Sequence, residues 1–168
     1  YPVGTHRIRW TVEDLCGNQD VVTYLFTVQD CKKPTPYCIS DITTVIMPSS
    51  GTVEIWAVDY DLGATDNCPG DLYFTFNCEK PNPGRVQAGQ NHYFKGNGVL
   101  ATEAEYLAGN AQYWLHDTRT SGKLFTCDNV GLNTLDVCVT DAAGNQDFCT
   151  VRLQVQANPP ACINFSRI

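Results

Sequence analysis

Two stretches of the chain alternate apolar and polar residues and contain the same short phrase. "VGTHRIRWTVEDLCGNQDVVTYLFTVQ" begins at Val3 and aligns without gaps with "VGLNTLDVCVTDAAGNQDFCTVRLQVQ", which begins at Val130, so the offset is 127 residues. Alternation with a period of two predicts a pair of β-strands in each stretch. The Gly-Asn-Gln-Asp phrase between them predicts a hairpin turn, because Gly adopts positive φ easily and Asn and Asp bond their own backbone.

The apolar positions of the two predicted hairpins coincide. Alternate residues of a strand share one face of a sheet, so the coincidence predicts equivalent core faces. We interpret the two stretches as parts of two copies of one β-domain. The aligned pairs are Ile8 and Leu135, Trp10 and Val137, Val12 and Val139, Tyr24 and Val151, Phe26 and Leu153, and Val28 and Val155.

The segments that follow the two hairpins are also alike. Each is rich in proline and leads to a Cys-Ile pair, which begins at Cys38 after the first hairpin and at Cys162 after the second. Strand-rich units that run into similar neighbours are typical of tandem arrays. The predicted segments are 1–30 (C-terminal strands of one unit), 31–37 (linker), 38–157 (a complete unit) and 158–168 (linker and first strand of the next unit).

The complete unit contains several further short strand patterns. They are "DITTVIM", "GTVEIWAV", "DLYFTFNC" and "KLFTC", and the second hairpin follows them. About seven short strands separated by turn signals are typical of an immunoglobulin-like sandwich. The predicted fold class is therefore all-β, with immunoglobulin-like β-sandwich repeats in tandem.

Residues 79–123 interrupt this pattern as one long insertion. Thr102 and Glu105 form a capping box, which predicts one short helix. The insertion also holds aromatic residues, among them Tyr113 and Trp114. A loop of this length is usually functional or packs as a lid. Two interpretations stay open: a lid over one sheet face, or a surface that contacts a ligand or partner.

Charge and cysteine content narrow the function classes. The net charge of −7 and the 17% charged residues give no basic footprint for nucleic acid and no polybasic membrane patch. No apolar run approaches the roughly 20 residues that span a bilayer, so we expect no membrane insertion.

The nine cysteines contain no C-x-x-C spacing of the kind that binds structural zinc. They favour disulfides and an extracellular location.

Strand parity indicates two cysteine pairs. Cys149 aligns with the core-facing Val22, so its sulfur is expected to point inward, and Cys38 on the first strand is its natural partner. Cys138 has the opposite parity and is expected to face outward, toward whatever covers that sheet. Cys78, at the start of the insertion, is its candidate partner, although parity places Cys78 with the aromatic residues of its own strand.

Several phrases of the complete unit resemble a known repeat type. "CISDITTVIM", "TDNC", "FTCDNVG" and "TDAAGNQDFCT" are similar to the hyalin-type and related immunoglobulin-like repeats of large secreted bacterial surface adhesins, closest to those of gliding-motility adhesins. The likeness covers most of the chain outside the insertion. It implies a long exported protein that acts at the cell surface as an adhesin or fibre, without catalysis. It also implies a disulfide between Cys68 and Cys127.

One acidic loop could hold a cation. Asp59, Asp61 and Asp66 offer the oxygen ligands that Ca²⁺ prefers, but their spacing does not match an EF-hand. A solvated acidic turn is the other interpretation. The sequence contains no catalytic triad motif, zinc-protease motif or phosphate-binding loop, so we expect no enzyme and no cofactor other than possible Ca²⁺.

The combined expectation is a disulfide-stapled structural or adhesive segment of an extracellular fibre, whose partners are neighbouring repeats or identical subunits. If the chain ends are natural, the terminal strand with Cys162, Ile163 and Phe165 could add to residues 1–30 of the next copy. The alternative is a carbohydrate-binding module of a secreted protein, in which Tyr113 and Trp114 stack on the rings of surface glycans.

Overall fold

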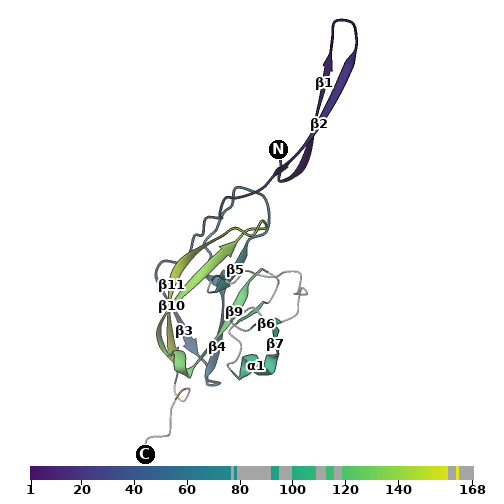
Figure 1. The fold of residues 1–168 in the computed structure, drawn as a ribbon. Coiled ribbons are helices and arrows are strands. Elements are labelled where there is room, and N and C mark those ends of the chain that lie inside the picture. The colour runs from purple at the N-terminus through teal and green to yellow at the C-terminus, as the bar shows by residue number, and fades with distance from the viewer. Residues whose placement is uncertain are drawn as a thin grey trace, which may run out of the picture. The chain divides into compact units, whose positions relative to one another are not determined.

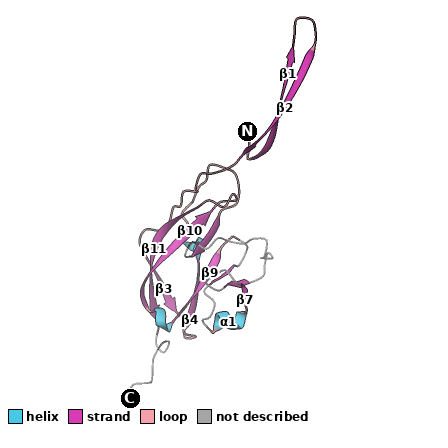
Figure 2. Cartoon of the chain, in the orientation of Figure 1, coloured by secondary structure: helices cyan, strands magenta, loops and turns pink. Residues whose placement is uncertain are grey.

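The computed structural model describes residues 1–76, 78, 92–94, 100–108, 113–115, 119–158 and 162 (Figure 1). The chain divides into two compact units, Tyr1–Cys31 (unit 1) and Lys32–Ile168 (unit 2). Most of the described residues lie in strands and few lie in helices (Figure 2), so the all-β prediction is confirmed. No helix in this described part of the chain is long and apolar enough to cross a membrane.

Unit 1 is a single antiparallel hairpin. It consists of β1 (Gly4–Glu13) and β2 (Gln19–Val28), and their register runs from Gly4 opposite Val28 to Glu13 opposite Gln19. Tyr1 packs edge-on against Phe26, with 5.1 Å between the ring centroids. The two strands form a two-stranded sheet of their own.

Unit 2 contains two sheets. The four-stranded sheet has the order β3-β11-β10-β5, and β3 runs parallel to β11 (Figure 1). The five-stranded sheet has the order β4-β9-β8-β6-β7, and its described pairings are antiparallel. The elements are β3 (Ile42–Met47), β4 (Thr52–Trp56), η1 (Ala57–Tyr60), β5 (Tyr73–Phe76), β6 (His92–Phe94), β7 (Leu100–Ala101), α1 (Glu103–Leu107), β8 (Tyr113–Leu115), β9 (Ser121–Thr126), η3 (Cys127–Asn129), β10 (Gly131–Thr140) and β11 (Gln146–Ala157).

Both sheets contribute to one core. Phe76 from β5 and Phe125 from β9 are fully buried in the same cluster, together with Val137 from β10. Val53 and Ile55 of β4 pack against this cluster from the second sheet. The alternation of β10 and β11 predicted their inward faces correctly, because alternate residues of a strand share one face. The buried positions are Leu135, Val137, Val139, Val151, Leu153 and Val155.

The two hairpins have the same register. Every residue pair of β1 and β2 maps onto a pair of β10 and β11 when 127 is added to both numbers. For example, Ile8 lies opposite Tyr24, and Leu135 lies opposite Val151. Cross-strand register determines which side chains share a face, so the two hairpins present equivalent faces.

The two turns also have the same hydrogen bonds. In the second turn the amide of Asp141 donates to the carbonyl of Asn145 at 3.0 Å, and the amide of Gly144 donates to the carbonyl of Asp141 at 3.1 Å. Asp14, Gly17 and Asn18 make the same two bonds in the first turn, at 2.9 and 3.1 Å.

Gly17 and Gly144 both adopt the left-handed backbone conformation, with φ of +85° and +88°. The Gly-Asn-Gln-Asp phrase thus specifies one turn geometry twice, because glycine enters this region without a Cβ clash. Hydrogen bonds from Asn18 lower the pKa of Asp14.

The described residues of the insertion form the predicted helix and three strands that were not predicted. The Thr102 hydroxyl accepts a hydrogen bond from the amide of Glu105, and the Glu105 carboxylate accepts one from the amide of Thr102, so the capping box before α1 is confirmed. Strands β6, β7 and β8 extend the sheet from the edge of β9. Each has only two or three residues, which is too short for a period of two to be visible in the sequence.

The segment predicted as a linker is attached to unit 2 by backbone bonds. The amides of Thr35 and Thr65 each donate to the other residue's carbonyl, at 2.7 and 3.1 Å, and the amide of Leu62 donates to the carbonyl of Tyr37 at 2.7 Å. Pro34 is fully buried. From Pro34 onward this segment is therefore part of the folded unit and not a free spacer.

Replacement of Asp141 with alanine is expected to destabilise unit 2. Asp141 is buried, and its carboxylate accepts hydrogen bonds from the amide and the side chain of Asn145, both at 2.8 Å. Leaving these donors without an acceptor should lower the free energy of unfolding by about 2 kcal/mol. Denaturant unfolding monitored by fluorescence measures this change. Asp14→Ala, at the equivalent position of unit 1, should leave the unfolding midpoint of unit 2 unchanged, and a wild-type midpoint in Asp141→Ala would contradict the assignment.

Candidate functional site

A disulfide joins Cys38, just before β3, to Cys149 in β11. Their Cα atoms are 6.3 Å apart, and both residues pack against the core. The pairing is the one that strand parity predicts, because Cys149 faces inward next to the start of the first strand. This bond closes a loop of 111 residues.

A second disulfide joins Cys78 to Cys138, with Cα atoms 4.9 Å apart. This is also the predicted pair. The parity conflict at Cys78 disappears because β5 ends at Phe76 and Cys78 has a left-handed backbone, with φ of +56°. Cys78 therefore no longer follows the alternation of its strand.

The third disulfide joins Cys127 to Cys162, and the prediction that Cys127 pairs with Cys68 was wrong. Cys162 has φ of +64°, and its Cα lies 5.2 Å from that of Cys127. The Cys162 sulfur also lies 3.4 Å from the sulfur of Met47. Cys162 is therefore bonded within unit 2, whereas the repeat alignment had assigned it to the start of a following unit.

The remaining three cysteines, Cys16, Cys31 and Cys68, form none of the disulfides. Cys16 lies in the exposed turn of unit 1. The side-chain amide of Asn67 donates to the sulfur of Cys68 at 3.2 Å.

The acidic residues proposed for calcium are used in separate turns. Asp59 accepts from the amide of Trp56 at 3.2 Å, and Asp61 accepts from the amides of the two residues at positions 63 and 64. Asp66 accepts from the amide of Cys68 at 3.1 Å. Within the described residues, neither Asp59 nor Asp61 belongs to any group of three metal-ligating side chains that converge on one point. The structure therefore does not bring the three predicted ligands together, and it favours the turn interpretation.

A small second core lies on the other face of β4. Tyr106 of α1 is buried there and packs with Trp56, Tyr93 and Leu124. The rings of Tyr93 and Tyr106 have centroids 4.9 Å apart. Strand β4 is therefore covered on both faces, by the main core on one side and by residues of the insertion on the other. This packing supports the lid interpretation for the part of the insertion around α1.

The Tyr106 hydroxyl donates a hydrogen bond to the carboxylate of Glu54 at 3.0 Å. Burial raises the pKa of Tyr106 well above its usual range, and the charge of Glu54 raises it further. On the neighbouring strand, burial lowers the pKa of Lys123, whose ammonium group lies 5.6 Å from the ring centroid of Phe125. The Tyr106 hydroxyl at this small core thus has a specific partner, whereas Lys123 shares its face of β9 with Phe125 of the main core.

The other predicted contact residues are only partly described. The backbones of Tyr113 and Trp114 lie in β8, where Trp114 pairs with Tyr93 on one side and Gly122 on the other. Their side chains lie outside the described part of the chain, as do Ile163 and Phe165.

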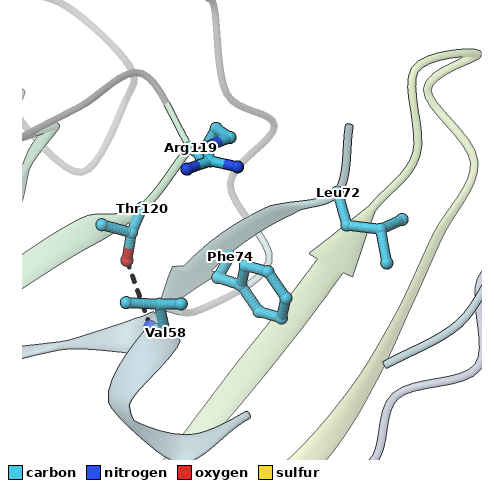
Figure 3. A pocket seen from close by; sticks show the side chains of 5 residues that line it. All are labelled: Val58, Leu72, Phe74, Arg119 and Thr120. Carbon is cyan, nitrogen blue, oxygen red and sulfur yellow. Dashed lines mark hydrogen bonds between the residues drawn. The ribbon is translucent and has the colours of Figure 1, made fainter. Parts of the chain in front are cut away.

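An apolar hollow of about 110 Å³ lies beside the start of β5. Figure 3 shows the five side chains that line it, and the Thr120 hydroxyl accepts a hydrogen bond from the amide of Val58 at 3.1 Å. These described lining residues include no carboxylate, imidazole or thiol. The hollow has room for a small apolar group. The lining residues are Val58, Leu72, Phe74, Arg119 and Thr120.

A scan of the chain against models of known protein families found no match, and a search of curated proteins found no relative. The functional interpretation therefore depends on the internal repeat, the disulfides and the insertion.

Tyr106→Phe is expected to weaken unit 2 in a pH-dependent way. Loss of the hydrogen bond to Glu54 should lower the free energy of unfolding by about 1–2 kcal/mol at pH 8. Because the folded pKa of Tyr106 is raised, its contribution is fully present below about pH 10 and is lost as the pH rises further. Denaturant titrations at pH 8 and pH 10.5 should therefore show a smaller difference between wild type and variant at the higher pH. A difference that grows with pH would contradict the assignment, and Tyr24→Phe in unit 1 serves as the control.

Proposed function

We propose that this chain is a structural or adhesive segment of an extracellular fibre, built from immunoglobulin-like units in tandem and stapled by disulfides. The main support is the shared register of the two hairpins together with their identical turn bonds. A hairpin of one unit that recurs in the same chain is typical of tandem arrays, whose function is to span distance or present surfaces.

The exposed face of unit 1 supports the tandem interpretation. Trp10 and Val12 are 60% and 66% exposed, whereas Val137 and Val139 at the equivalent positions of β10 are fully buried. Tyr24 is 58% exposed. A lone two-stranded hairpin is marginally stable in water, and contiguous apolar faces of this kind normally have a partner. The hairpin thus has the sequence of a core element without the second sheet that covers its counterpart.

Three intrachain disulfides are compatible with an extracellular setting, because disulfides persist in oxidising compartments and are rare in the cytosol. The resemblance of the TDNC, FTCDNVG and TDAAGNQDFCT phrases to adhesin repeats points to the same setting. The partners in this proposal are neighbouring repeats or identical subunits.

Assembly between identical subunits would use strand addition. In the proposal, the segment with Cys162, Ile163 and Phe165 pairs with the free edge of β2 in the next copy, as β3 pairs with β11 within unit 2. The Cys127–Cys162 bond restricts this segment at its first residue. Sedimentation velocity of Phe165→Asp tests the idea, since strand addition predicts loss of any assembly that the wild type forms.

Immunogold labelling of intact source cells tests the main proposal. Antibodies against unit 2 should label the surface of unpermeabilised cells, because an extracellular fibre is accessible without lysis. Antibodies against a cytoplasmic protein serve as the negative control. Label that appears only after permeabilisation would contradict the proposed location.

The second candidate function is a carbohydrate-binding module. The insertion supports it, because β8 continues the β9 sheet edge and carries Tyr113 and Trp114 in sequence, and sugar rings stack on aromatic side chains. In a glycan array, this candidate predicts dose-dependent binding that Trp114→Ala reduces at least tenfold. Tyr37→Ala, which removes an exposed aromatic residue outside the insertion, should bind as the wild type does. No binding by the wild type would favour the fibre.

A further inference from the structure

The ends of unit 2 are connected by a covalent route much shorter than the chain. The Cys38–Cys149 disulfide lies at the N-terminal end of the unit, and 13 residues then lead from Cys149 to Cys162 at the other end. The 111 residues between Cys38 and Cys149 lie outside this route.

We propose that unit 2 transmits tension through the Cys38–Cys149 bond and strand β11, so that the rest of the unit is shielded from pulling forces. This inference rests on the proposed function as a fibre, since only a protein held at both ends carries tension. A force applied at the incoming segment first reaches the backbone bonds of residues 35 and 37, and then reaches Cys38. From there the disulfide passes it to Cys149.

More than half of this route is already extended in the folded unit. Cys149 lies near the start of β11, which ends at Ala157, and the strand is already extended over these eight residues, or about 26 Å. Thirteen fully extended residues reach about 45 Å. While the disulfide is intact, Cys149 and Cys162 therefore cannot move further apart than about 45 Å.

The parallel pairing of β3 with β11 would resist mechanical unfolding if the Cys38–Cys149 disulfide is reduced. Strand β3 lies beside β11 (Figure 1) and runs parallel to it. The register pairs Ile42 with Arg152 through Met47 with Ala157. In the reduced chain, tension would enter at the start of β3 and leave at the end of β11. The two strands would then slide along one another, and all the ladder bonds between them would be loaded together.

The other two disulfides do not shorten this route. Cys78–Cys138 closes a loop of 60 residues inside the shielded part, and Cys127–Cys162 links the exit point back to η3. If the Cys38–Cys149 bond is removed, the shortest remaining route has 40 residues from Cys38 to Cys78 and 11 from Cys138 to Cys127, 51 in all. The two routes thus differ by 38 residues.

Single-molecule force spectroscopy of the full chain tests the proposal, with protein handles fused to both termini. Residues 1–37 and 163–168 contribute the same length in every variant. The double variant Cys38→Ala/Cys149→Ala should reach a contour length about 130 Å longer than the wild type, which corresponds to 38 extended residues. The matched control Cys78→Ala/Cys138→Ala should have the wild-type contour length, because its shortest route is unchanged.

A control variant that lengthens, or a wild type that already has the length of the Cys38→Ala/Cys149→Ala variant, would overturn the proposal. If that variant does not fold, the wild type held at constant force with added reductant gives the same information. Cleavage of the Cys38–Cys149 bond under tension should increase the end-to-end length in a step of about 130 Å or more. Absence of such a step would overturn the proposal that the rest of unit 2 is shielded. These contour lengths do not depend on where the protein is located in the cell. Negative surface labelling would therefore contradict the proposed fibre function without changing the measured contour lengths.

Discussion

The disulfide between Cys38 and Cys149 ties the segment that enters unit 2 to the strand that leaves it. In the chain-entropy model, closing a loop of this size stabilises the fold by roughly 4–5 kcal/mol. The bond also fixes where β3 begins relative to β11, and the parallel ladder between these strands starts three residues further along β11. The four-stranded sheet, and the core that it shares with the second sheet, are arranged around that junction.

The β1–β2 and β10–β11 hairpins have the same register but different surroundings in the two units. In unit 2 the apolar face of the β10–β11 hairpin is buried by the second sheet, and the Cys38–Cys149 bond lies at its edge. In unit 1 the equivalent face is exposed, and Val22 takes the position of Cys149. The register alone therefore does not define a complete unit, because a hairpin becomes a core element only when a second sheet covers it. The insertion adds another layer, since Tyr106 and its neighbours cover the outer face of β4.

Much of this fold could be predicted from the sequence, because the signals were local or repeated. Alternation predicted both hairpins, glycine and asparagine predicted their turns, and Thr102 with Glu105 predicted α1. Parity predicted the partner of Cys149. The strands of the insertion were missed because a three-residue strand has no visible period and depends on the edge of β9.

The prediction that Cys127 pairs with Cys68 was wrong for a different reason. The position of Cys162 depends on a left-handed backbone at that residue, which no local pattern encodes. The proposed calcium ligands Asp59 and Asp61 are two residues apart in sequence, but they accept hydrogen bonds in different turns. Sequence proximity gave no information on whether their oxygens converge.

The bond between Cys38 and Cys149 connects the two ends of unit 2. Peptide mapping by mass spectrometry under non-reducing conditions, with free thiols blocked before digestion, tests it most directly. We expect a linked pair of peptides that contain Cys38 and Cys149 and that separate on reduction. Recovery of Cys38 with a blocked thiol, or linked to any other cysteine, would contradict it.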